Sequence, residues 1–105
     1  MAADAPAAER AVGFFERLAY DLSTAGKDCD QIAGRLSSFT RSHQTDYPSL
    51  ANQAQHTPLD PEARAAHDQR LRSALASILT AVDNCPAHTG AQKAFTEFDL
   101  LVDPH

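Results

Sequence analysis

The chain contains 105 residues, 43% of them hydrophobic, and has a formal charge of −5 because fourteen acidic residues stand against nine basic ones. This length suits one domain with one core, and the hydrophobic runs are too short for a membrane span. The acidic balance argues against binding to nucleic acid or to anionic membranes, which both require cationic groups. We therefore expect a single soluble domain over residues 1–105, with residues 1–6 as a flexible end.

The first predicted helix runs from about Ala7 to Ala25. Its apolar residues recur at spacings of three and four, which places them on one face of a helix with 3.6 residues per turn. They are Ala8, Ala11, Phe15, Leu18 and Leu22, widened by Val12, Phe14 and Ala19. Gly26 follows and favours the left-handed conformation that ends many helices, so we expect a short turn there.

The second predicted helix begins after Asp28, which can accept hydrogen bonds from the first-turn amides and has Gln31 at the capping-box spacing. Its apolar stripe reads Cys29, Ile32, Ala33, Leu36, Phe39, His43, Tyr47, Leu50 and Ala54. Pro48 interrupts the stripe, because proline lacks the amide that a helix interior needs and clashes with the preceding turn. We expect a kink or a restart near Asp46.

The third predicted helix begins at Asp60-Pro61-Glu62, which combines a capping aspartate, a proline at the first position and an acid in the first turn. Its stripe consists of His67, Leu71, Leu75, Ile78 and Val82, with Ala74 and Leu79 beside it. The helix should end before Pro86, since residues that precede proline avoid helical angles.

The fourth predicted helix follows Thr89, which stands three residues before Gln92 at the capping-box spacing. Its apolar residues are Ala91, Phe95, Phe98 and Val102. We expect His88 to be an exposed turn residue rather than a zinc ligand beside Cys85. Short connections favour antiparallel neighbours, so the sequence predicts an all-α fold, an antiparallel up-down-up-down four-helix bundle with a kinked second helix.

Two cysteines stand at the ends of predicted helices, Cys29 at the start of the second and Cys85 at the end of the third. If these helices are antiparallel neighbours, both thiols lie at the same end of the bundle, and a disulfide is the favoured interpretation. The alternative is two free thiols that act as small apolar core residues in a reducing cytosol. A bridge predicts a periplasmic or secreted protein, and free thiols predict a cytoplasmic one.

Two histidines fall on otherwise apolar stripes, His43 in the second predicted helix and His67 in the third. If the cysteines are level, the imidazoles differ by about 6 Å along the bundle axis. They could hold a metal ion or line a site for an apolar ligand, with Tyr47 one turn from His43. The commoner explanation is that each histidine is hydrogen-bonded at a helix edge and binds no ligand.

No pattern typical of catalysis is found, since there is no nucleophile with a base, no catalytic carboxylate pair and no glycine-rich phosphate loop. The acidic residues, Glu9 and Glu16 among them, mostly fit helix caps and solvated faces. The sequence therefore favours a non-enzymatic helical interaction module that contacts another protein. The alternative is a small bundle that binds a metal ion or an apolar ligand through His43 and His67. The sequence specifies no cofactor and leaves the oligomeric state open.

Overall fold

The computed structural model describes residues 7–56 and 58–103, and all regular structure in these residues is helical. Five helices follow one another: α1 (Ala7–Thr24), α2 (Cys29–Ser42), α3 (Asp46–Gln55), α4 (Pro61–Asp83) and α5 (Thr89–Val102). The all-α prediction is confirmed for this part of the chain. The predicted flexible segment 1–6 lies outside the described residues.

The turn between α1 and α2 is made by the residues that the sequence marks for it. Gly26 has a φ of 63°, in the left-handed region that favours glycine. The Asp28 carboxylate then accepts a hydrogen bond from the Gln31 amide at 3.2 Å, which caps α2. The Gln31 side chain does not return this bond, because its Oε1 accepts from Arg35 at 2.9 Å.

The expected kink in the second predicted helix is a complete break. The helix stops at Ser42 and a new one starts at Asp46, so Pro48 stands in a first turn, where its missing amide breaks no helical hydrogen bond. The Tyr47 amide still donates to the His43 carbonyl at 3.0 Å across the break. The described residues therefore form five helices, and the simple four-helix bundle is not confirmed.

The last two helices begin with different caps. Asp60 accepts from the Ala63 amide at 2.7 Å, as its position before Pro61 predicts. At α5 the cap is His88, whose Nδ1 accepts from the Ala91 amide at 3.0 Å. The prediction of a Thr89 cap was wrong, because an unprotonated ring nitrogen accepts an amide proton as well as a hydroxyl oxygen does. His88 is partly buried rather than fully exposed, with its Nε2 2.7 Å from Oδ1 of Asp30.

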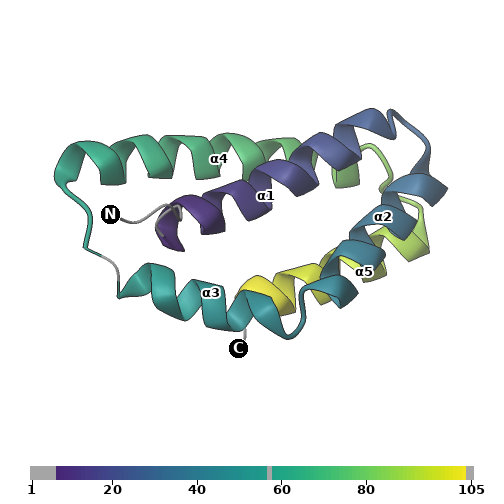
Figure 1. Ribbon diagram of the computed structural model, residues 1–105. Coiled ribbons are helices and arrows are strands. Elements are labelled where there is room, and N and C mark those ends of the chain that lie inside the picture. Colours follow the sequence, from purple (N-terminus) through teal and green to yellow (C-terminus); the bar gives the residue numbers. More distant parts are fainter. Residues whose placement is uncertain (1–6, 57, 104–105) are drawn as a thin grey trace.

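The helices that pack most closely are α1 with α4 and α2 with α5, and α1 also packs against α3 (Figure 1). Glu9 lies beside His67 near the starts of α1 and α4, and Leu22 faces Ala81 near their ends, so these two helices run parallel. Helices α2 and α5 run parallel as well. Antiparallel neighbours are therefore not the main contacts, because apolar spacing specifies which face of a helix is buried but not which helix covers it.

The core lies where these two pairs meet. Its largest side chains with almost no exposed area are Phe14, Leu18, Leu22, Ile32, Leu36, Ile78 and Phe98. Helix α4 packs mainly along α1, and its backbone approaches α2 and α5 over short stretches and α3 nowhere closely. The opposite edge of α4 therefore has little of the described chain beside it.

Candidate functional site

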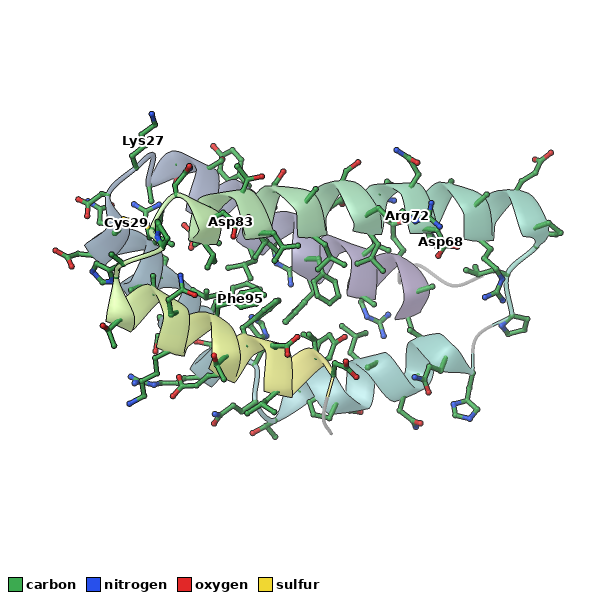
Figure 2. The ribbon with its side chains drawn as sticks, turned by 180° about the vertical axis from the view of Figure 1, so that it is seen from behind. Lys27, Cys29, Asp68, Arg72, Asp83 and Phe95 are labelled. Atoms are coloured by element: carbon green, nitrogen blue, oxygen red, sulfur yellow. A yellow bond between two sulfur atoms is a disulfide. The ribbon has the colours of Figure 1, made fainter. Side chains whose placement is uncertain are left out.

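Cys29 and Cys85 connect the start of α2 to the residues after α4. Their Sγ atoms lie 2.12 Å apart and their Cα atoms 5.8 Å apart, so the two thiols form a disulfide. The sequence analysis assumed that α2 and α4 are neighbours along their length, but the two thiols meet for a different reason. They meet because α5 lies along α2, which brings the turn between α4 and α5 to the start of α2. Figure 2 shows Cys29 at this end of the molecule.

An ion cluster that the sequence analysis missed joins α1 to α4. The Arg70 guanidinium bonds to both carboxylate oxygens of Glu9, at 2.7 and 2.8 Å, and to both oxygens of Glu16, at 2.6 and 3.0 Å. Glu9 and Glu16 are seven residues apart and therefore share a face of α1, which allows one arginine to reach both. This spacing was the signal in the sequence. The hydrogen bonds from Arg70 lower the pKa of both carboxyls and raise the pKa of Arg70.

His67 completes the ion cluster from α4. Its Nε2 lies 3.0 Å from Oε1 of Glu9, and its Nδ1 is buried without a hydrogen-bond partner. A neutral ring with its proton on Nε2 suits this geometry, because Nε2 then donates to the carboxylate and the buried Nδ1 carries no unpaired N–H. His67 therefore has a structural contact of its own on the α1–α4 seam.

His43 and Tyr47 lie in an aromatic cluster around Phe14 of α1. The Phe14 ring centroid is 5.0 Å from that of His43, 4.5 Å from that of Tyr47 and 4.7 Å from that of Phe39. His43 Nδ1 also lies 3.1 Å from Oδ1 of Asp46. Burial raises the pKa of the Tyr47 phenol. Rings from both sides of the α2–α3 break therefore pack on one phenylalanine.

His43 and His67 line different surface hollows. His43 borders one of about 330 Å³ between α1 and α2, whereas His67 borders one of about 300 Å³ between α1, α3 and α4. Within residues 7–56 and 58–103, no group of three or more His, Cys, Asp or Glu side chains is placed to hold a metal ion. The structure thus gives the two histidines separate surroundings, since His43 packs on the Phe14 ring and His67 lies beside the Glu9 carboxylate. A ligand shared by both stays a prediction.

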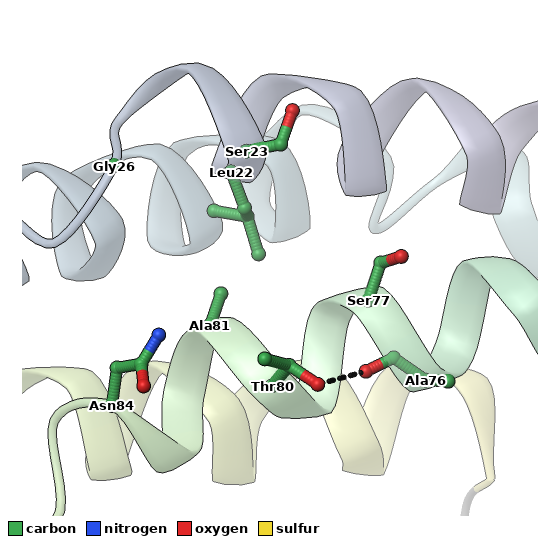
Figure 3. A pocket seen from close by; sticks show the side chains of 8 residues that line it. All are labelled: Leu22, Ser23, Gly26, Ala76, Ser77, Thr80, Ala81 and Asn84. Carbon is green, nitrogen blue, oxygen red and sulfur yellow. Dashed lines mark hydrogen bonds between the residues drawn. The ribbon is translucent and has the colours of Figure 1, made fainter.

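A shallow groove of about 330 Å³ runs between the second halves of α1 and α4 (Figure 3). Leu22 and Ala81 face one another across it, and its other lining residues are Ser23, Gly26, Ala76, Ser77, Thr80 and Asn84. The Thr80 hydroxyl donates to the Ala76 carbonyl at 2.8 Å. None of the lining side chains titrates near neutral pH, so the groove offers no general acid or base.

The outer edge of α4 is the side of this helix turned away from α1, and helical spacing places five residues in line along it. They are Asp68, Arg72, Leu75, Leu79 and Asp83. Leu79 is 45% exposed and Leu75 is partly buried. In the described part of the chain, the side chains of Asp68, Arg72 and Asp83 are exposed and form no ion pair or hydrogen bond. Asp68 lies at the border of this edge, where it also lines the hollow beside His67. Figure 2 shows Asp68, Arg72 and Asp83 along α4, with Phe95 of α5 below them.

Comparisons with known proteins find no match. No protein-family model, curated protein or solved structure is significantly similar to this chain. In the described ranges, no helix combines the length and the apolar character needed to cross a membrane.

Proposed function

We propose that this protein is a non-catalytic helical interaction module that binds another protein through the outer edge of α4. The observation that carries the proposal is Leu79, which is 45% exposed on the longest of the described helices and follows Leu75 by one turn. Protein interfaces are typically built from an apolar centre with a polar rim. The two leucines supply the centre, and the charges of Asp68, Arg72 and Asp83 supply the rim.

The position of α4 in the fold supports this choice. Its inner side packs along α1, where the Arg70 ion cluster holds the two helices together. The backbone of α4 does not approach that of α3 closely and approaches that of α5 only over a short stretch. A partner helix could therefore lie along this edge without any change in the fold of the chain.

We also propose that the protein works in an oxidising compartment, the periplasm or the outside of a cell. The Cys29–Cys85 bridge closes a loop with a sequence separation of 56 residues. In the chain-entropy treatment such a closure stabilises the fold by about 4 kcal/mol, and a reducing cytosol would remove this contribution.

A site-specific photocrosslinker tests the interaction surface. We would incorporate p-benzoylphenylalanine at position 79 and, as a matched control, at position 20, where Tyr20 is 72% exposed on α1. After irradiation of cells that produce the full chain, position 79 should give a discrete adduct of one mass that position 20 does not give. Absence of an adduct at 79, or the same adducts from both positions, would reject the proposal.

The hollow beside His67 favours a second function, the binding of a small apolar ligand. Its walls are mostly apolar, and its volume of about 300 Å³ lies at the lower end of the range for ligand pockets. The lining residues are Ala8, Ala11, Val12, Ala54, Gln55, Leu59, Arg64, His67, Asp68 and Leu71.

An environment-sensitive apolar dye tests this second function. The dye should bind saturably to the parent protein and to S77F, which fills the groove of Figure 3 instead. It should not bind to A54F, which fills the hollow. Equal binding to A54F and S77F would exclude the hollow as the site. Calorimetric titration with zinc of the parent protein and of His43→Leu would test the metal-binding form of this alternative.

A further inference from the structure

We infer that the partner of the α4 outer edge is a second copy of this chain, paired α4 against α4 in antiparallel orientation, with Arg72 of each copy facing Asp83 of the other. This inference rests on the proposed function, because it uses the same edge. It adds the identity of the partner and the register of the contact.

The order of charges along the edge suits self-association. Arg72 stands three residues before Leu75, and Asp83 stands four residues after Leu79, so the leucine pair has a positive charge at one end and a negative charge at the other. Neither charge has a partner within the described part of its own chain. A second copy in antiparallel orientation places its Asp83 beside the first copy's Arg72 and its Arg72 beside the first copy's Asp83.

One register satisfies the apolar and the ionic contacts together. In a two-fold pair of antiparallel helices, if residue i of one copy faces residue j of the other, then residue j of the first also faces residue i of the second. The two numbers of every facing pair therefore add up to the same value along the contact. In the inferred pair, Leu75 of one copy contacts Leu79 of the other, and Arg72 of one copy contacts Asp83 of the other. The registers that these two contacts require differ by one residue. This difference is an offset of about 1.5 Å along the helix, which long side chains span easily.

Other arrangements of the same two edges are less favourable. A parallel pair in register would place Arg72 against Arg72 and Asp83 against Asp83, and like charges at close range repel. An antiparallel register that paired Arg72 with Asp68 would move the leucines away from one another. In the inferred register, Asp68 reaches the level of the partner's Pro86, beyond the end of the partner's α4 at Asp83.

Charge reversal tests the register. We would measure the mass of the oxidised full chain by sedimentation velocity up to high micromolar concentration, where the parent should form a dimer. R72D and D83R should each weaken this dimer about tenfold or more, because each places like charges at both ends of the contact. An equimolar mixture of R72D and D83R should dimerise again, since a mixed pair restores opposite charges at both ends. Helical content by circular dichroism should be unchanged in both variants.

Arg17→Asp is the matched control, because Arg17 is exposed on α1 and reversal there makes the same change in net charge. It should leave the dimer intact. A parent that is monomeric at every concentration would overturn the inference, as would reversals that do not weaken the dimer or a mixture that stays monomeric. If the parent is monomeric but position 79 crosslinks to a protein of another mass, the proposed function stands and only this inference fails.

Discussion

Arg70 of α4 holds Glu9 of α1 by two parallel hydrogen bonds, Nη1 to Oε1 at 2.7 Å and Nη2 to Oε2 at 2.8 Å. The same guanidinium also reaches Glu16, so one side chain fixes the rotation of α1 and its position along α4. Paired planar groups of this kind give directional contacts, which apolar packing alone does not. The parallel arrangement of α1 and α4 is therefore specified by an ionic contact as well as by the core.

Loss of the arginine should loosen this seam. We expect Arg70→Leu to lower the free energy of unfolding by about 1 kcal/mol, a modest loss because the Arg70 side chain is 38% exposed and water screens the charges. Chemical denaturation measures the loss, and high salt should reduce it. Arg17→Leu is the control and should change stability much less. Equal losses in the two variants would contradict a specific role for the cluster.

The same cluster should make stability depend on pH on the acid side. The folded-state pKa values of Glu9 and Glu16 are lowered from 4.5, so the unfolded chain binds protons first as the pH falls. The stabilisation is fully present above the unfolded pKa and is lost as the pH drops through the lower, folded values. Urea denaturation from neutral to acid pH should therefore show a smaller acid-side loss in Glu16→Gln than in the parent. If the free energy of unfolding falls equally with acid in both proteins, the carboxylates are excluded as the source of this pH dependence.

The disulfide should stabilise the fold without being needed for its shape. We expect Cys29→Ser to lower the melting temperature in oxidising buffer and to match the parent once both are reduced, because the bridge acts mainly on the unfolded chain. Far-ultraviolet circular dichroism should show the same helical content for both proteins at low temperature. Intact mass after alkylation of the native protein checks the bridge itself, and two alkylated thiols before reduction would disprove it.

Replacement by alanine should change the stability of the fold in opposite directions at two glycines. Gly26 has a positive φ and Gly34 lies inside α2, and a Cβ at either position meets no atom within 4 Å. Gly26→Ala should therefore destabilise by about 1 kcal/mol through backbone strain alone. Gly34→Ala should stabilise by about 0.5–1 kcal/mol, because alanine favours the helix interior. Thermal melts of both variants check the pair, and a change of the same sign in both would refute this explanation.

The helix boundaries could be predicted because each depends on chemistry within a few residues. Asp28 and Asp60 cap as expected, and Gly26 turns the chain as expected. The cap at α5 was missed because His88 caps through a ring nitrogen, which the usual serine, threonine, aspartate and asparagine patterns do not include.

Which helices pack together could not be predicted, because an apolar stripe can be buried equally well against any other apolar stripe. The two histidines show the effect on the candidate site. His43 and His67 lie at similar heights along the predicted axis, yet the break after Ser42 and the pairing of α1 with α4 give them different neighbours. The outer edge of α4 was likewise not visible in the sequence, where Leu75 and Leu79 resemble the leucines of the core.

The disulfide also makes one covalent ring of residues 29–85, which contains α2, α3 and α4. A protease that cuts once in the connection between α3 and α4 would open this ring but release nothing. Both pieces stay linked through sulfur, and the closely packed pairs α1–α4 and α2–α5 each keep one helix from either piece. A nicked molecule would thus migrate as an intact chain until it is reduced, so the bridge protects the assembled helices against the loss of either piece after one such cut.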